Sequence, residues 1–226
     1  WQSFNIAANH LVEFIQPSAN AIALNRVVGL NGVIPTSLID GTLRANGIVL
    51  LLNQNGILFG SGAQVNVGGL VASTLHMTDA DFLAGTYRAT RLITDGLVQT
   101  VGDIRNAGTI TAGTHGVYLL APNVENSGVI TSPNGSIVLA AGTTAYLANR
   151  PDGRGFLVEL QAPAGSARNL RDLTADGGSI TMAGLVVNQQ GLVQANTVQA
   201  NRGRIELVAN QPATAQAGDP VASLTL

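Results

Sequence analysis

"NQNGILFGSGAQVNVGGLVAST", Asn53 to Thr74, contains no Cys, His, Asp, Glu, Lys or Arg, so this stretch carries no acid–base or metal chemistry. Its apolar residues come in short alternating bursts, Ile57 with Phe59 and Val65 with Val67, and each burst ends in Gly or Asn. Alternation with a period of two is typical of strands that bury one face, while Gly and Asn are typical of tight corners. The stretch therefore predicts short strands joined by sharp turns.

Two short units recur beyond this stretch. "IRNAGTITA" (Ile104–Ala112) returns at an offset of 20 as "VENSGVITS" (Val124–Ser132), and again as "VVNQQGLVQA" (Val186–Ala195) with one residue inserted. A second unit, in which Gly precedes alternating large apolar residues, occurs as "GVYLLA", "GSIVLA", "GSITMA" and "GRIELVA". The two units interleave along the chain, so the sequence has a repeat of about 20 residues.

A unit of this length cannot bury the apolar face of its strands alone and must stack on copies of itself. Helical repeats are disfavoured, because Gly or Asn occurs every few residues and Val, Ile and Thr are frequent. The predicted fold is therefore all-β, a parallel β-helix. Asn106, Asn126 and Asn188 are expected at equivalent corners, where their side chains stack and share hydrogen bonds from coil to coil.

Three segments depart from the repeat. Trp1–Pro17, which is rich in aromatic residues, is expected to form a cap, or part of one, over the open end of the solenoid. Ser73–Gly96 is expected to leave the coil, with a short helix at Thr78–Ala84 whose N-cap is Thr78. Asn149–Gly178 is expected to form a second excursion, with a hairpin around Phe156–Leu160. The β-helical domain is predicted to span 1–210, and 211–226 to form a tail or linker.

Composition excludes several classes of function. The net charge is −2, and the eleven basic residues are all Arg and are scattered singly, so no basic surface for nucleic acid is expected. No apolar run reaches the ~18–20 residues of a membrane-spanning helix. The absence of Cys excludes disulfides and thiol catalysis, and it suits a chain that crosses an oxidising space unfolded.

Candidate metal-binding residues are sparse. His10, His76 and His115 lie far apart and show no metal-ligand spacing. "TDAD" at Thr78–Asp81 has the start of a calcium loop but lacks the Gly and the terminal carboxylate, so a solvated loop or the start of a helix is favoured. No metal or cofactor is expected.

Two rival functions remain open. Polysaccharide-cleaving β-helix enzymes need paired carboxylates, and the best available cluster is Asp95 with Asp103, preceded by Arg88 and Arg91. Half-exposed loop charges explain this cluster equally well, so no enzymatic activity is expected. A glycan-binding adhesive module would need an exposed row of aromatic side chains, and aromatic residues make up only 4% of the chain.

Three long motifs are more specific than the repeat: "ALNRVVG" from Ala23, "GTLRANGIVLLLNQNGILFGSGAQVNVGGLVAST" from Gly41 and "APNVENSGVITSPNGSIVLAAG" from Ala121. These motifs resemble the secretion domain of two-partner secretion exoproteins, the filamentous-haemagglutinin-like (haemagglutination activity domain) proteins of Gram-negative bacteria. "NQNGI" is similar to the family's "NPNGI" signature, with Gln54 where Pro is usual. The resemblance extends from Trp1 to about Ala209.

The resemblance implies a right-handed parallel β-helix at the amino end of a large exoprotein that is secreted through the periplasm or displayed on the cell surface. It implies recognition by the POTRA domains of a dedicated outer-membrane barrel transporter. Downstream regions would act as an adhesin, haemolysin, inhibition toxin or biofilm component, with host or matrix glycans and proteins as partners. In the family a signal peptide and further strands precede the position of Trp1, so an incomplete cap is expected.

Six residues are predicted to recognise the transporter or to build the fold at these motifs: Asn53, Asn55, Gly56, Ile57, Asn25 and Arg26. A purely structural interpretation is available for each, since Asn and Gly form corners and Ile57 suits the core. Both roles stay open at this point.

Overall fold

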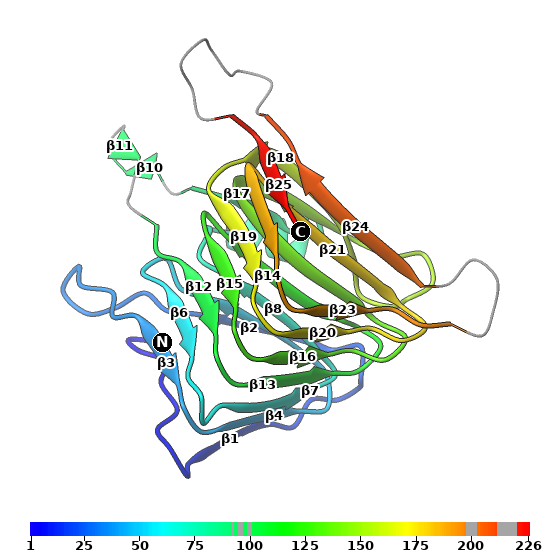
Figure 1. The fold of residues 1–226 in the computed structure, drawn as a ribbon. Coiled ribbons are helices and arrows are strands. Elements are labelled where there is room, and N and C mark those ends of the chain that lie inside the picture. Colours follow the sequence, from blue (N-terminus) through cyan, green and yellow to red (C-terminus); the bar gives the residue numbers. More distant parts are fainter. Residues whose placement is uncertain (92, 95–96, 99–100, 198–202, 212–220) are drawn as a thin grey trace.

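The computed structural model describes residues 1–91, 93–94, 97–98, 101–197, 203–211 and 221–226. In these residues the chain winds repeatedly through three sheets, and the strands of successive coils pair in parallel. Figure 1 shows the coils stacked along one direction, from blue at the amino-terminal end to orange and red at the other. The predicted parallel β-helix is confirmed.

Each coil contributes one strand to each sheet. The first sheet runs β1 (Leu11–Phe14), β4 (Thr42–Ala45), β7 (Gln64–Val67), β13 (Thr109–Ala112), β16 (Val129–Thr131), β20 (Asp172–Thr174) and β23 (Leu192–Gln194). The second sheet runs β2 (Ile22–Arg26), β5 (Ile48–Leu52), β8 (Gly69–Ser73), β14 (Val117–Ala121), β17 (Ser136–Asn149), β21 (Ser179–Gly184) and β24 (Arg204–Ala209). The third sheet runs β3 (Ser37–Ile39), β6 (Ile57–Phe59), β12 (Ile104–Asn106), β15 (Val124–Asn126), β19 (Ser166–Asn169), β22 (Val186–Gln189) and β25 (Ser223–Thr225).

The core is an apolar column inside these coils. One row of it comes from the third sheet, in which Ile57, Ile104, Val124, Ala167 and Val187 lie in register and are at most 1% exposed. Each side chain faces inward because strand residues alternate between faces, and each fully buried aliphatic side chain contributes roughly 1.5–3 kcal/mol. Stacking of coils, rather than any single coil, produces this burial.

The pairing register confirms the 20-residue repeat, since Asn106 lies opposite Asn126. The expected third member is wrong: Asn169 lies opposite Asn126, and Gln189 lies opposite Asn169. Asn188 instead lies opposite Arg168. A shift of one residue turns a side chain to the other face of a strand. The residue inserted in "VVNQQGLVQA" therefore comes before the corner amide, which is Gln189, and not after it.

The amino-terminal segment serves both as a cap and as part of the first coil. Phe4 is buried, with its ring stacked on Phe14 at 6.5 Å and packed edge-on against Trp1 at 5.7 Å. Ile6 is also buried, and it forms an isolated bridge to Ile39. However, β1 pairs in parallel with β4, so Leu11–Phe14 belong to the first sheet.

The first excursion leaves the coil after β8, whose last residue is Ser73. Its helix α1 spans Asp79–Leu83, and the Thr78 hydroxyl accepts a hydrogen bond from the Asp81 backbone N–H at 3.0 Å, which confirms the predicted N-cap. The strands β9 (Arg88–Thr90), β10 (Ile93–Thr94) and β11 (Leu97–Val98) follow. The predicted end at Gly96 lies outside the described residues.

The second excursion is shorter than Asn149–Gly178, because β19 and β20 fall inside that range and belong to the third and first sheets. The signals for these two strands are weak, since "ARNLRDLTA" interrupts its apolar alternation with three charged residues. The predicted hairpin is present and longer than expected: β18 (Phe156–Pro163) runs antiparallel to the end of β17. Strand β9 also pairs antiparallel with β17, so the two excursions meet in one small sheet.

The region beyond residue 210 includes one strand of the solenoid, because β25 pairs in parallel with β22. The boundary expected at 210 stays a prediction. Within the described ranges, no helix is both long enough and apolar enough to span a membrane.

Candidate functional site

The Asn53–Ile57 corner clamps the chain that enters β3. Asn53 is buried, and its Nδ2 donates to the Pro35 carbonyl at 2.9 Å and to the Ser37 hydroxyl at 2.8 Å. Its Oδ1 accepts from the Asn55 backbone N–H at 3.0 Å, which closes the turn by a local side-chain bond. Because every polar atom of Asn53 points inward, this residue holds the structure and offers no surface of its own.

Asn55 extends the same clamp at the surface. Its Nδ2 donates to the Ile34 carbonyl at 2.7 Å, and its own carbonyl accepts from the Thr36 hydroxyl at 2.9 Å. Gly56 has φ +111, a conformation that side-chain-bearing residues rarely adopt, and Ile57 then enters the core. The four motif residues therefore fix the path of residues 34–37.

A tight hairpin comes directly before the clamped residues. Leu30 and Val33 exchange backbone hydrogen bonds of 3.0 Å, and Asn31 and Gly32 between them have φ of 50 and 78, the pattern of a two-residue hairpin turn. Gly29 precedes it with φ 72, and a Cβ there would lie 2.1 Å from the Val33 carbonyl oxygen. Only Gly fits at position 29.

This hairpin exposes apolar side chains. Val28 is 59% exposed, Leu30 55% and Val33 69%, and we call these three residues the apolar hairpin patch. Single exposed apolar residues are common, but a group on one rigid turn is typical of an interaction surface.

Asn25 and Arg26 face opposite sides of β2. Asn25 is buried at the inner side, where its Oδ1 accepts from the Trp1 indole N–H at 2.9 Å. Arg26 faces outward, and its guanidinium donates to Asp79 at 2.7 Å and to the Met77 carbonyl at 2.7 Å. Asn25 thus ties the cap to the first coil, while Arg26 ties the first excursion to it.

Arg26 also lines a groove of about 230 Å³ beside the apolar hairpin patch, which we call the N-terminal groove. Its lining consists of Arg26, Val27, Val28, Ile34, Leu52, Gln54, Leu75, His76 and Met77. Among the described residues, the buried Nε of Arg26 has no hydrogen-bond partner. Burial lowers the pKa of His76, as does the nearby Arg26, while Asp79 and Asp81 act in the opposite direction. At neutral pH the groove therefore combines apolar walls, one guanidinium and a neutral imidazole.

The structure brings two of the predicted motifs together. Arg26 and Gln54, from "LNRVVG" and "NQNGI", line one groove because β2 and β5 are paired neighbours. Asn25, Asn53 and Ile57 are buried and do not line it. The sequence interpretation missed His76 and Met77, whose contribution comes from the path of the first excursion.

Of the two carboxylates considered for an enzyme, the structure describes only Asp103. Asp95 lies outside the described residues. The Asp103 carboxylate accepts from Asn123 Nδ2 at 2.9 Å and lies 3.9 Å from Arg105, while Arg88 lies over the Tyr146 ring at 5.6 Å. Across the described ranges, no group of three or more His, Cys, Asp or Glu side chains is placed to hold a metal ion.

A family model described as the TPS secretion domain matches residues 1–221. The chain belongs to the TPS secretion domain family. This TPS domain is similar to the HMW1 secretion domain from Haemophilus influenzae, known from its crystal structure, with a TM-score of 0.81 and 33% identity over 94% of this chain and 55% of that chain. The resemblance to two-partner secretion exoproteins is thereby confirmed.

Two curated relatives carry the name heme/hemopexin-binding protein. The one from Haemophilus influenzae strain ATCC 51907 / DSM 11121 / KW20 / Rd is 40% identical over 145 residues, which are 63% of this chain and 16% of that protein. The other, from Haemophilus influenzae, is 41% identical over 95 residues, 42% of this chain and 10% of that protein. The match therefore spans a minor part of each relative.

Membership of the TPS family fixes the broad role. TPS exoproteins pass through the periplasm and leave through an outer-membrane transporter, so the expected secretion to the cell surface or exterior is confirmed. The family is a secretion domain and not a family of enzymes.

Proposed function

We propose that the N-terminal groove and the apolar hairpin patch form the surface by which the POTRA domains of the transporter recognise this TPS domain. The observation that carries the proposal is the exposure of Val28, Leu30 and Val33 on a hairpin that Asn53 and Asn55 hold in place. Binding of a partner over such an apolar surface is favourable by roughly 25 cal/mol per Å² of apolar area removed from water.

In this proposal the six predicted residues have different tasks. Arg26 lines the contact surface and holds the first excursion beside it through Asp79 and Met77. Asn53, Asn55, Gly56 and Ile57 act indirectly, because they fix the hairpin that carries the patch. Asn25 acts through the cap. The proposal requires the first coils to be folded when the transporter binds.

We propose further that these first coils open for passage through the transporter, refold outside the cell and there act as the folding nucleus of the exoprotein. Each coil that docks on the previous one buries a new apolar row and pairs its backbone along three sheets, so the solenoid grows in one direction. A folded stack on the outer side would oppose backward movement through the transporter.

The activity of the complete protein is proposed to reside downstream of the TPS domain, which would serve as its scaffold. Adhesion to host or matrix glycans and proteins is the activity that the family resemblance suggests, and haem or hemopexin binding is the one that the names of the relatives suggest. If a downstream segment without the TPS domain were released at the normal rate, this division of roles would be contradicted.

The recognition proposal is tested by co-expression with the neighbouring transporter and measurement of release into the medium. A triple variant, Val28→Ser with Leu30→Ser and Val33→Ser, is expected to reduce release tenfold or more, since loss of about 1.4 kcal/mol of binding already gives a factor of ten.

The matched control places the same change on exposed apolar residues elsewhere, Ile15→Ser with Leu192→Ser, whose exposures are 88% and 53%. This control is expected to be released normally. Equal release of the triple variant and the unmodified chain, under conditions where release needs the transporter, would overturn the recognition surface. Thermal unfolding of both purified variants checks that each remains folded.

A further inference from the structure

A second cavity lies at the other end of the same sheet. Its volume is about 460 Å³, and it opens between the outer face of β17, β21 and β24 and the loop that joins β17 to β18. We call it the C-terminal cleft. The cleft is separate from the N-terminal groove, because the two share no lining residue and β8 and β14 lie between the strands that line them.

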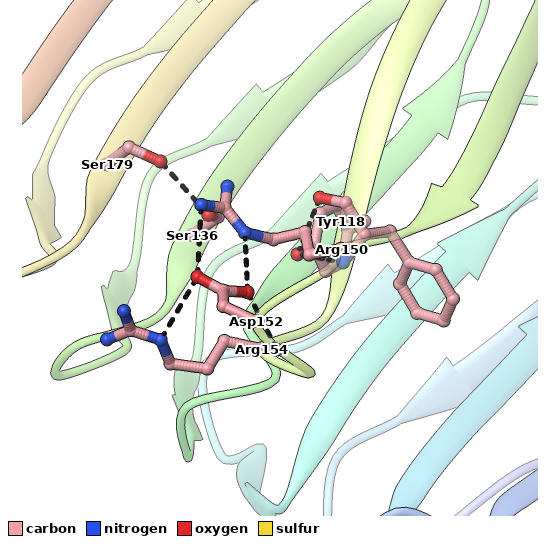
Figure 2. Close-up of polar contacts among 7 residues, drawn as sticks. Tyr118, Ser136, Arg150, Asp152, Arg154 and Ser179 are labelled. Atoms are coloured by element: carbon pink, nitrogen blue, oxygen red, sulfur yellow. Dashed lines mark hydrogen bonds and ion pairs between the residues drawn. The ribbon is translucent and has the colours of Figure 1, made fainter.

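Two guanidiniums in the wall of the cleft share one carboxylate (Figure 2). Arg150 Nε and Nη2 donate to Asp152 at 3.2 and 3.4 Å, and Arg154 Nε donates to it at 3.3 Å. The Arg154 backbone N–H adds a bond of 3.1 Å. These hydrogen bonds, that from Arg150 foremost, lower the pKa of Asp152 to about 2. The carboxylate is ionised at neutral pH, and the trio keeps one uncompensated positive charge.

The same trio is partly removed from water and held rigidly. The side chains of Arg150, Asp152 and Arg154 are 32%, 36% and 31% exposed. Within the described part of the chain, both Nη groups of Arg154 are free of hydrogen bonds. A guanidinium oriented in advance by a carboxylate loses little freedom when it binds an anion in a forked geometry.

The floor of the cleft is lined with hydroxyl groups. Ser136 and Ser179 lie on adjacent strands with their hydroxyl oxygens 3.0 Å apart (Figure 2), and Thr181 lies on the same face. At the outer end, Arg204 and Glu206 form an ion pair that is neutral overall. Hydroxyl donors and acceptors next to a net positive charge match a ligand that carries both hydroxyls and an anionic group.

We propose that the C-terminal cleft binds an anionic sugar unit of a surface glycan, whose carboxylate or phosphate pairs with Arg150 and Arg154 and whose hydroxyls bond to Ser136 and Ser179. The volume is within the ~300–1,000 Å³ usual for small-ligand sites. The lining combines these polar groups with four apolar side chains, Val138, Phe156, Leu157 and Val158. The shared Asp152 orients the two guanidiniums, and the net positive charge of the trio favours ligands that bring a negative charge.

The test is titration calorimetry of the whole chain with single sugars. D-Glucuronate probes the carboxylate, D-glucose 6-phosphate probes the phosphate, and D-glucose is the neutral control. At least one anionic sugar is expected to bind saturably in the millimolar range or tighter, with affinity that falls as salt is raised, while glucose binds at least about tenfold more weakly.

The variant Arg154→Gln, which removes the charge and leaves a shorter polar side chain, is expected to weaken binding about tenfold or more. Arg171→Ala, which removes an exposed guanidinium elsewhere, is expected to bind normally. Thermal unfolding of both variants shows whether the cleft loop is intact, and Arg154→Lys gives a second, milder replacement.

Absence of saturable binding by either anionic sugar, or equal binding by Arg154→Gln, would overturn the proposal and leave the trio as a brace of the loop. Neither outcome affects the transport proposal, because release is measured separately.

Discussion

A column of side-chain amides runs through the interior of the third sheet. Asn106 Nδ2 donates to Asn126 Oδ1 at 2.8 Å, Asn126 Nδ2 to Asn169 Oδ1 at 2.8 Å, and Asn169 Nδ2 to Gln189 Oε1 at 3.0 Å. Each amide also donates to a carbonyl two residues further on, as Asn126 does to Gly128 at 3.1 Å. The three Asn residues are fully buried. Burial of these polar groups is tolerated because each amide finds partners in its own coil and in the next.

Asn126→Ala is expected to lower the free energy of unfolding by about 3 kcal/mol. The substitution removes the acceptor of the buried Asn106 Nδ2 and the donor to the buried Asn169 Oδ1. Denaturant unfolding measures this change. The control is Asn188→Ala, outside the column, which is expected not to lower stability, because the buried Oδ1 of Asn188 has no hydrogen-bond partner among the described residues. Equal effects of the two substitutions would contradict the register in which Gln189, and not Asn188, continues the column.

At the scale of elements, the two excursions are joined to the solenoid by one aromatic cluster. Tyr118 projects from the outer face of β14, and its hydroxyl accepts from the Phe156 N–H at 2.8 Å and donates to the Phe156 carbonyl at 3.1 Å. The Phe156 ring packs edge-on against Tyr118 and Tyr87 at 5.4 and 5.3 Å, and Tyr87 contacts Phe82 at 6.0 Å. The outer face of the second sheet is therefore a second core, sealed by the excursions.

Tyr118→Phe is expected to lower the free energy of unfolding by about 1–3 kcal/mol, since the removed hydroxyl leaves both backbone groups of Phe156 without this partner in a buried site. Limited proteolysis of the loop at residues 150–155 is expected to become faster. Tyr146→Phe is the matched control, because Tyr146 contacts Arg88 through its ring, and the ring is retained. Unchanged stability and proteolysis in Tyr118→Phe would show that the hydroxyl does not anchor β18.

The helix and the strands of the two excursions differ in how far the sequence could predict them. The helix at Asp79–Leu83 was predictable because its signal, a Thr that caps an acidic first turn, is local. The strands β19 and β20 were not predicted, since "ARNLRDLTA" places charged residues on outward positions and only small or single apolar residues inward. Their inward positions are recognisable only once Ala167 is seen in register with Val124.

At the scale of the whole molecule, acid is expected to destabilise the fold through two histidines. Burial lowers the pKa of His115, and burial together with Arg26 lowers that of His76. An unfolded chain therefore takes up protons on these side chains more readily than the folded one below the ordinary pKa of about 6.5. The stabilising effect of their neutral state is complete above this value and is lost as the pH falls below it.

The expected result is a lower free energy of unfolding at pH 5 than at pH 7.5, measured with denaturant at both values. His76→Gln combined with His115→Gln is expected to flatten this slope, because Gln does not titrate. Asp152 contributes only in more acid solution, since its folded pKa is about 2 and its ordinary value about 3.9. A double variant with an unchanged slope would show that other groups govern the acid sensitivity.

The sequence by itself determined that the chain is a stack of coils with an apolar interior. The alternation of apolar residues, the Gly and Asn corners and the 20-residue spacing are local features, and the direction of a strand side chain follows from its place in such a pattern. Only the tertiary structure decided which amides form the buried column and which residues line the N-terminal groove and the C-terminal cleft. Insertions between coils shift the register by whole residues, and an excursion meets the sheet wherever distant side chains pack best, so neither outcome is encoded in neighbouring residues.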